Sequence, residues 1–297
     1  MPGLKEVRIR IASVKSTQQI TAAMKMVAAS KLRKAQNSII RLRPYAAKLR
    51  EILENLSGSI ENSAESEYSA KRPPEKILLI VIASNRGLCG AFNSNIIKTT
   101  TGLLNSTYNS QFSKGNVSLI TIGKKATEFF QKRNYKVIAS HDDFFNKLTF
   151  AQISPFAEYL MESFVKKEFD RIDIIYNQFK NAAVQRLVTE QFLPVVQDTS
   201  AGKPANSKVT ADYIFEPDRE TVIGGLIPKT LRIQVFKALL DSFAAEMGAR
   251  MTAMQQATDN ARDLLRALNI AYNKARQNQI TNALIEIISG SEALQGK

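Results

Sequence analysis

Apolar residues recur at alternating steps of three and four along the first 60 residues of the chain. Fourteen of the 17 positions on this seam, counted from Leu4 to Ile60, are apolar. The polar interruptions are Gln18, Thr21 and Lys25. A helix over residues 3–60 would be about 85 Å long, far longer than a small domain of ~30 Å. The pattern therefore predicts one long helix, bent at Pro44 rather than ended there, because the seam resumes at once.

The same stepping returns in the last third of the chain, which holds no proline after Pro228. Its seam positions are Leu240, Phe243, Met247, Met251, Met254, Thr258, Ala261, Leu265, Leu268, Tyr272 and Ala275. A second long helix is expected. A domain of this size cannot cover both stripes, so the two helices are expected to pack on each other, with a left-handed supercoil from the spacing near 3.5.

Between the two seams, short runs rich in β-branched residues alternate with helical stretches. The predicted strands are 76–84, 117–123, 135–140 and 171–179, and the predicted helices are 93–104, 124–132 and 153–167. This alternation predicts a mainly parallel, doubly wound sheet, with a further strand over 183–194 for which an antiparallel direction is considered. The polar stretches 57–74 and 197–208 are interpreted as linkers.

The predicted fold class is thus α/β: two long terminal helices in a coiled coil and a central doubly wound domain. The predicted divisions are an N-terminal helix over 1–60, an α/β domain over 75–196 and a C-terminal helix over 213–297.

Positive charge is concentrated at the start of the chain. The 297 residues carry a formal net charge of +14, and the first 50 hold 12 Lys or Arg against one acid, Glu6, a balance of +11. Such unbalanced charges on one helix repel each other unless an acidic partner meets them. The alternative interpretation is a merely solvated helix surface.

Nucleic acid is one acidic partner to consider. The first 60 residues contain a single aromatic residue, Tyr45, so stacking platforms for single strands are missing, and no RNA-binding or helix-turn-helix signature is present. A basic coiled-coil nucleic-acid-binding protein, using phosphate contacts alone, stays open as the rival class. An α/β enzyme with a helical arm, such as a tRNA-handling ligase, is a more distant third.

Candidate chemistry is sparse. One cysteine, Cys89, and one histidine, His141, exclude an internal disulfide and a Cys/His metal site. No apolar run approaches the roughly 20 residues that span a bilayer, and the start lacks the apolar core of a signal peptide. Cys89 has no nearby base and is interpreted as inert or redox-modifiable. His141, beside Asp142 and Asp143, is interpreted as part of a solvated loop rather than an acid/base or metal cluster.

The loop SNRGLCG (84–90) invites comparison with glycine-rich phosphate-binding turns. It lacks the GxGxxG order, and Gly123-Lys124-Lys125 has neither a glycine five residues earlier nor a Ser or Thr after the lysine. Both are expected to be structural turns rather than nucleotide sites.

Four segments resemble the gamma subunit of F-type ATP synthases. They are IRIASVKSTQQITAAMKMVAASKLRKAQ (9–36), SNRGLCGAFN (84–93), YIFEPD (213–218), and the end, ARMTAMQQATDNA with YNKARQNQITNALIEIISGSEAL (272–294). The resemblance spans the whole chain in the right order. Its terminal segments are highly specific, because no other common family combines them with a central α/β domain.

The resemblance implies that the terminal helices form an antiparallel coiled-coil axle inside a ring of alternating alpha and beta subunits, with the α/β domain at its base. ATP is then made and hydrolysed on the beta subunits, and this chain is a rotor without a catalytic site or cofactor. The epsilon subunit and the membrane c-type ring are further implied partners. Membrane association is then indirect, through the complex.

The resemblance also implies roles for individual residues. The contact with the beta catch loops is implied for Arg276, Gln277 and Thr281. Acidic loops at the beta rim are implied to meet Lys31, Arg33, Lys34, Arg41 and Arg43. The collar residues are Met24 and Lys25, and the foot on the membrane ring and epsilon is implied for Tyr213 and Glu216.

The chain departs from the family pattern at Ala283, where many members carry a carboxylate. It also lacks the added redox segment with paired cysteines found in chloroplast members, so thiol switching is not expected. The start at MPGLKEVR, without an Arg/Ser-rich leader, resembles bacterial forms. The expected location is peripheral, on the cytoplasmic side of a bacterial inner membrane.

Overall fold

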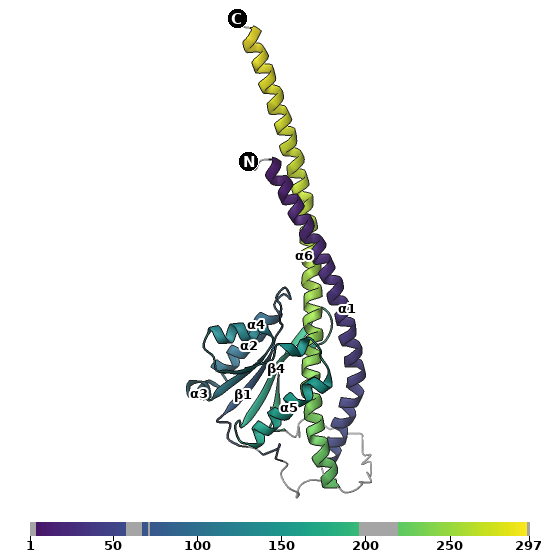
Figure 1. The fold of residues 1–297 in the computed structure, drawn as a ribbon, viewed down its shortest axis with the longest axis vertical. Coiled ribbons are helices and arrows are strands. Elements are labelled where there is room, and N and C mark those ends of the chain that lie inside the picture. The colour runs from purple at the N-terminus through teal and green to yellow at the C-terminus, as the bar shows by residue number, and fades with distance from the viewer. Residues whose placement is uncertain (1–3, 58–66, 71, 196–218, 296–297) are drawn as a thin grey trace, which may run out of the picture. The chain divides into compact units, whose positions relative to one another are not determined.

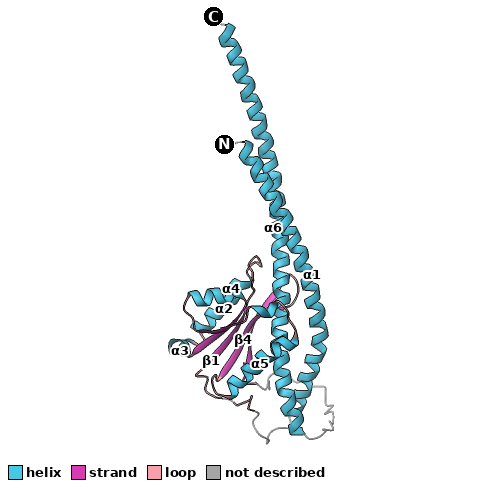
Figure 2. Cartoon of the chain, in the orientation of Figure 1, coloured by secondary structure: helices cyan, strands magenta, loops and turns pink. Residues whose placement is uncertain are grey.

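The computed structural model describes residues 4–57, 67–70, 72–195 and 219–295. Two long helices, α1 (Leu4–Ser57) and α6 (Arg219–Gln295), stand at the two ends of the chain, as the seams predict. The chain divides into two compact units, one of residues 1–28 with 251–297 and the other of residues 29–250. Figures 1 and 2 show the helices and strands of each unit.

In the first unit, the beginning of α1 and the C-terminal part of α6 run in opposite directions along each other (Figure 1). The buried seam residues are Val7, Thr21, Ala28, Met254, Thr258 and Ala261. Thr21 and Thr258 face each other, with their hydroxyl oxygens 2.8 Å apart. One polar interruption of the predicted seam is therefore buried as a hydrogen-bonded pair rather than exposed. The predicted antiparallel coiled coil is confirmed here.

The second unit contains a five-stranded sheet in the order β3-β2-β1-β4-β5. Its strands are β1 (Ile77–Ile82), β2 (Val117–Ile122), β3 (Val137–Ser140), β4 (Arg171–Phe179) and β5 (Gln185–Leu193). β1 pairs in parallel with both β2 and β4, β2 pairs in parallel with β3, and β5 pairs antiparallel with β4. The mainly parallel sheet is confirmed, and the direction of the further strand is antiparallel.

Helices cover both faces of this sheet, which makes it doubly wound (Figure 1). On one side lie α2 (Phe92–Asn105) and α4 (Lys124–Lys132), and on the other lie α5 (Phe150–Val165) and α6. Every residue of β1 is buried, as expected for a central parallel strand. A single apolar cluster joins β1, β2 and β4 to α5 and α6.

Two short elements were not predicted, namely α3 (Asn109–Ser113) and the 3-10 turn η1 (Asp143–Phe145). Both are too short, at five and three residues, for a periodic apolar signal to mark them.

The rest of α1 belongs to the second unit. Its seam residues Leu32, Ala35, Ile39 and Leu49 are buried, as the heptad pattern predicts. The helix continues through Pro44 to Ser57. Most of the first predicted linker and all of the second lie outside the described residues.

Candidate functional site

The strand order places a topological switch point beside β1. The chain proceeds from β1 to β2 and β3 on one side and then returns to β4 on the other. Doubly wound sheets bind ligands in the crevice at the carboxyl ends of the strands at such a point. Here the carboxyl end of β1 continues into the SNRGLCG loop, so this loop is where a nucleotide site would have to form.

The polar groups of the SNRGLCG loop bond to each other and to Asn93 at the start of α2. The Asn93 side-chain oxygen accepts from the Ser84 backbone N–H at 3.0 Å, and the Ser84 hydroxyl donates to the Arg86 carbonyl at 2.7 Å. The Asn93 amide donates to the Cys89 sulfur at 3.3 Å. Cys89 is only 1% exposed, and burial raises the pKa of its thiol. The cysteine is thus a packed, poorly ionised group, which supports its interpretation as an inert turn residue.

The backbone N–H groups at the start of α4 also have hydrogen-bond partners in this chain. The Lys124 backbone N–H donates to the Asn85 side-chain oxygen at 3.1 Å, and the Lys125 N–H donates to the Ser84 carbonyl at 3.1 Å. Gly123 has a φ of 104°, and a Cβ atom built there would lie 2.3 Å from the Ala83 carbonyl oxygen. This glycine allows α4 to approach the end of β1. The N–H groups that a phosphate would need already have partners, which favours the structural interpretation.

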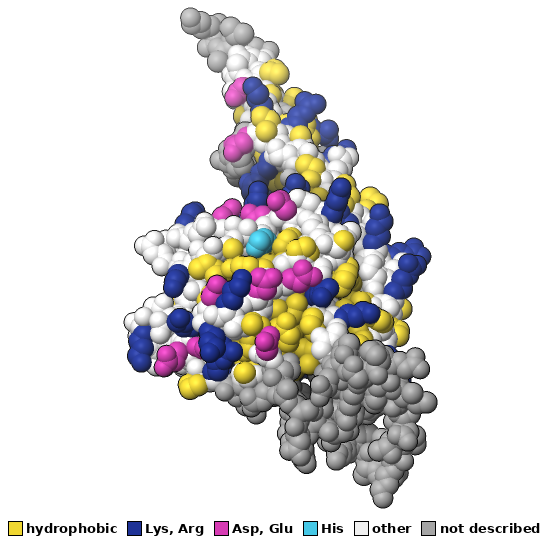
Figure 3. All heavy atoms as spheres, turned by 60° about the horizontal axis from the view of Figure 1, so that its bottom comes forward, with side chains coloured by type: hydrophobic (Ala, Val, Ile, Leu, Met, Phe, Trp, Pro, Cys, Tyr) yellow, Lys and Arg dark blue, Asp and Glu magenta, His cyan; other side chains and the backbone are white. Residues whose placement is uncertain are grey.

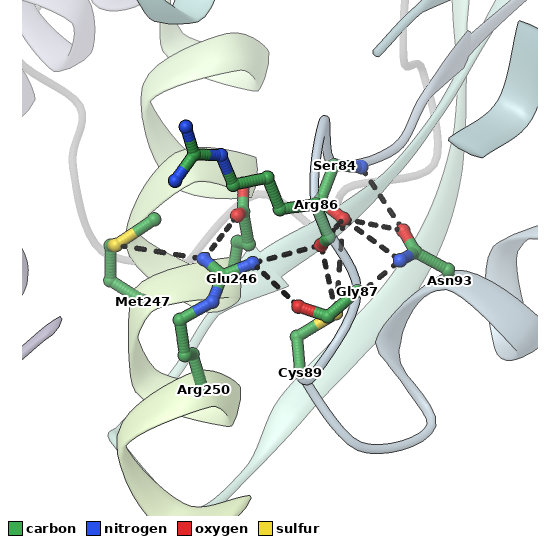
Figure 4. Close-up of polar contacts among 8 residues, drawn as sticks. All are labelled: Ser84, Arg86, Gly87, Cys89, Asn93, Glu246, Met247 and Arg250. Carbon is green, nitrogen blue, oxygen red and sulfur yellow. Dashed lines mark hydrogen bonds and ion pairs between the residues drawn. The ribbon is translucent and has the colours of Figure 1, made fainter. Parts of the chain in front are cut away.

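Helix α6 reaches the same loop through Arg250 (Figure 4). One terminal nitrogen of Arg250 donates to the carbonyls of Arg86 at 2.9 Å and Gly87 at 3.2 Å. The other pairs with Glu246, one helical turn earlier. The two side chains are only 11% and 7% exposed. We call Arg250, Glu246 and the carbonyls of Arg86 and Gly87 the loop clamp.

The loop clamp is a charge-assisted contact in a mostly buried position. Burial raises the pKa of Glu246, while the Arg250 guanidinium and the Lys31 ammonium oppose that rise. Gly248, two residues before Arg250 on α6, lets the backbone around Ala182 approach, because a Cβ at Gly248 would lie 3.1 Å from the Ala182 carbonyl oxygen. The switch-point end of the sheet is thus bonded to α6, an arrangement suited to holding two elements in register.

The structure differs from the expectation for His141. Its ring is half-buried and stacks on Phe144, with ring centroids 4.8 Å apart, and meets Phe156 edge-on. Burial lowers the pKa of His141. The predicted solvated loop is therefore wrong for this side chain, because the ring serves as an aromatic packing group.

The five basic residues predicted to meet acidic loops all lie on α1 in the second unit, and all are exposed: Lys31, Arg33, Lys34, Arg41 and Arg43. Two of them also interact electrostatically with carboxylates of this chain. Burial raises the pKa of Glu246 and of Asp241, and Lys31 opposes the first rise while Arg43 opposes the second. Part of the positive charge of α1 is therefore balanced by carboxylates of this chain. Figure 3 shows Lys and Arg side chains in a row beside hydrophobic ones.

Asp241 is a buried carboxyl that sequence reasoning missed. It is 3% exposed, and its Oδ1 atom has no hydrogen-bond partner within the described residues. Burial raises its pKa to about 6, opposed by Lys237 and Arg43 and assisted by Glu190. Asp241 is thus a buried carboxyl on α6 with charged neighbours and one oxygen that lacks a hydrogen bond within the described residues.

The predicted catch residues Arg276, Gln277 and Thr281 lie on α6 in the first unit, and all three are exposed, as is Ala283. From Arg276 to Ser291 every side chain of α6 is exposed. The predicted collar residues differ from these, because Met24 and Lys25 are partly buried on α1. The predicted foot residues, Tyr213 and Glu216, lie outside the described residues.

The described residues also bear on two other classes of site, a membrane span and a metal centre. No described helix has the length and apolarity to cross a membrane. Nowhere in the described ranges do three or more His, Cys, Asp or Glu residues gather as a potential metal site.

Comparison with known proteins gives consistent matches. A family model described as ATP synthase matches residues 3–294. A protein of Flavobacterium johnsoniae named ATP synthase gamma chain is 50% identical over 300 residues, covering 100% of both chains. A protein of Cytophaga hutchinsonii with the same name is 47% identical over 295 residues, covering 99% of both chains. The chain belongs to the ATP synthase gamma chain family.

Solved structures agree with the gamma chain fold. A chain of the Euglena gracilis mitochondrial ATP synthase, in a cryo-EM structure of OSCP/F1/c-ring in rotational state 3, matches with a TM-score of 0.70. It is 25% identical and is covered to 94%, while 98% of this gamma chain is covered. A chain of the Tetrahymena thermophila mitochondrial ATP synthase, from a structure of the central stalk and c-ring, has a TM-score of 0.59 and shares the fold.

Within this gamma chain, the loop clamp is the part of the site that sequence reasoning missed. Glu246 and Arg250 stand four residues apart, a spacing that permits a helical ion pair. That spacing was the available signal, but it gave no indication of the SNRGLCG carbonyls.

Proposed function

We propose that this chain is the central-stalk rotor of an F-type ATP synthase and has no catalytic site of its own. The observation that carries the proposal is its identity of 47% and 50%, over essentially the full length, with bacterial proteins named ATP synthase gamma chain. The satisfied SNRGLCG loop and the occupied start of α4 support a chain that works mechanically.

The partners in this proposal are alternating alpha and beta subunits, an epsilon subunit and a membrane c-type ring. The similar Euglena gracilis chain comes from a structure of OSCP/F1/c-ring. The chain then lies on the cytoplasmic side of the cell inner membrane and associates with it through the complex.

The mechanism is differential binding. As the membrane ring turns the stalk, each beta site meets a different surface of the chain and adopts the conformation that this surface stabilises. Energy then passes as differences in contact free energy. The loop clamp contributes by bonding α6 to the α/β domain, so that a twist applied to one is carried to the other through hydrogen bonds to charged groups.

Each predicted contact has a part in this proposal. Exposed Arg276, Gln277 and Thr281 offer polar groups to the beta catch loops, while the basic residues from Lys31 to Arg43 meet acidic loops at the rim. Met24 and Lys25 serve as the collar, and Tyr213 and Glu216 as the foot. Exposed ion pairs contribute about 0 to 1 kcal/mol each, so the rim acts through several residues together.

The test is purification of the intact complex from native membranes, followed by identification of its subunits and assay of ATP hydrolysis. Because alpha and beta subunits alternate in a ring around one stalk chain, we expect each of them in threefold excess over this chain. We also expect duplex DNA binding of the purified chain to be weak and non-specific at about 0.15 M salt. Sequence-specific nanomolar DNA binding, or purification without alpha and beta chains, would overturn the proposal.

A further inference from the structure

A groove of about 490 Å³ lies in the second unit, away from the loop clamp. Its walls come from α1, from the start of α5 and from the first part of α6. Three aromatic side chains line it, Tyr45, Phe150 and Phe236, together with the cations Lys229 and Arg232 and the buried Ile233.

The aromatic residues leave apolar surface on the rim of the groove. Tyr45 is 44% exposed and Phe150 is 41% exposed. Phe150 also meets Phe236 edge-on, with ring centroids 5.8 Å apart, which holds the two rings as one wall. Exposed aromatic groups beside an arginine have the composition of protein-binding hot spots.

Among the described residues, each of the two cations contacts one side chain. The Lys229 ammonium lies 5.8 Å from the centre of the Tyr45 ring. Arg232 pairs with Glu158 at 3.3 Å through one terminal nitrogen. Its Nε atom is buried and has no hydrogen-bond partner within the described residues. The groove therefore offers the exposed Lys229 ammonium and the Arg232 guanidinium, whose side chain is 34% exposed, next to apolar walls. The buried Nε atom itself lies out of reach of an occupant.

We infer that this groove binds an acidic amphipathic peptide segment of another subunit, with an apolar side chain between the aromatic rings and a carboxylate on Lys229 and Arg232. Charge complementarity commits the groove to this occupant. Exposed Arg41 and Arg43 on the adjoining part of α1 add positive charge, whereas Glu158 opposes a multiply charged phosphate or lipid headgroup beside Arg232. The inference rests on the proposed function, since it requires neighbouring subunits.

The test places a photoreactive amino acid, p-benzoyl-phenylalanine, at position 45 of the chain in the complex purified from native membranes. After irradiation, mass spectrometry identifies the cross-linked peptide. We expect a peptide of another subunit, with an apolar residue at the cross-link and Asp or Glu within a few residues. In the same assay, Lys229→Glu reduces the cross-link about fivefold, the upper range for an exposed ion pair, and Lys229→Arg retains it.

Lys98→Glu serves as the matched control, because Lys98 is an exposed lysine on α2. It leaves the cross-link unchanged. Cross-links confined to this chain, to a lipid, or to a neutral or basic peptide overturn the inference, as does the lack of any adduct. Alpha and beta chains in the same preparation report on the proposed function independently, so the two failures are distinguishable.

Discussion

Arg250 on α6 donates to the backbone carbonyl of Arg86 at 2.9 Å, joining residues 164 positions apart in the chain. The contact fixes a loop carbonyl to a helix through a guanidinium that also pairs with Glu246. Removing one member of such a buried pair leaves the other charge without its partner, which typically costs more than the pair contributes.

Arg250→Ala is therefore expected to lower the free energy of unfolding by about 3 to 5 kcal/mol, the range for breaking a buried ion pair. Urea denaturation of the purified chain measures it. Adding Glu246→Gln to the variant should recover part of the loss, because the buried charge disappears. Arg262→Ala is the control, since Arg262 pairs with Asp259 on the same helix but is 52% exposed. Equal losses for Arg250→Ala and Arg262→Ala would contradict the loop clamp.

Gly123→Ala tests the close approach of α4 to β1. The φ of 104° is a conformation that L side chains rarely adopt, and the new Cβ would meet the Ala83 carbonyl oxygen at 2.3 Å. Backbone strain alone is expected to cost about 1 to 3 kcal/mol. Gly102→Ala, on the exposed side of α2 with nothing within 4 Å, should instead stabilise the chain slightly. Thermal unfolding of both variants decides the matter, and a neutral Gly123→Ala would contradict the packing described.

The long helices were predictable because apolar residues recur at every third or fourth position, as the burial of one stripe of each helix requires. Each described seam residue of α1, from Leu4 to Leu49, is buried or partly buried. The predicted helix over 124–132 has the bounds found in the structure, since Gly123 marks its start. Strand positions in the sheet followed from β-branched runs, and strand order did not, because pairing depends on contacts between distant residues.

The buried polar contacts were not predictable from local pattern. Thr21 interrupts the seam, yet only its partner Thr258, 237 residues away, explains why it is tolerated there. Asp241 lies next to the seam residue Leu240 and resembles any polar flanking residue in the sequence. The loop clamp likewise could be found only in the three-dimensional structure. Its acceptors are backbone carbonyls, which every residue type carries, so the sequence does not mark them.

Asp241 predicts a pH-dependent stability. Its pKa in the folded chain is about 6, against 3.8 for an ordinary aspartate, so the folded state holds a proton that the unfolded state has lost between these values. The stabilisation is complete below pH 3.8 and disappears as the pH rises through 6. Asp241→Asn should therefore raise the stability by about 2 to 3 kcal/mol at pH 7.5, and much less at pH 4.5.

The measurement is the difference in melting temperature between Asp241→Asn and the wild type across this pH range. The facing groups Lys237, Arg43 and Glu190 are unchanged in both chains, so the difference isolates Asp241. Asp263→Asn, at an exposed ion pair, is the control and should show no comparable gain at pH 7.5. A pH-independent difference for Asp241→Asn would show that its carboxyl stays ionised throughout.

Cys89 should react slowly with thiol reagents, because it is 1% exposed and burial raises its pKa. We expect its alkylation at pH 7.5 to be at least about tenfold slower in the native chain than in urea, since the thiolate is the reactive form. Cys89→Ser should leave the ATPase activity of the reconstituted complex within about twofold. A loss above about a hundredfold would reveal chemistry in the SNRGLCG loop that its hydrogen bonds do not suggest.

The far end of α6 carries more exposed apolar surface than a solvated helix end normally does. Ile280 and Leu284 are each 54% exposed, Ile287 is 68% exposed and Ile288 is 57% exposed. These residues are spaced by four, three and one positions, so they share one side of the helix. Such a stripe needs an apolar surrounding and favours aggregation without one.

We propose that the apolar tip and the polar residues before it make contacts of different kinds. We therefore expect deletion of the tip to affect assembly of the complex, and substitution of the polar residues to affect its turnover. Deleting residues 287–297 removes apolar contact area and should reduce the yield of the alpha/beta/gamma complex, while rotation-coupled ATPase stays detectable because torque also acts lower on the helix.

Replacing Arg276 and Gln277 together by Ala should leave assembly intact and lower turnover, since hydrogen bonds to charged groups contribute about 1.5 to 3 kcal/mol each. Gel filtration of the complex reports assembly, and ATPase per assembled complex reports turnover. Lys274→Ala removes an exposed cation about two helical turns before Thr281. It is the control and should change neither quantity measurably. If the deletion and the double substitution lowered assembly and turnover in the same proportion, the tip and the polar residues would form a single contact, and their separate roles would have to be abandoned.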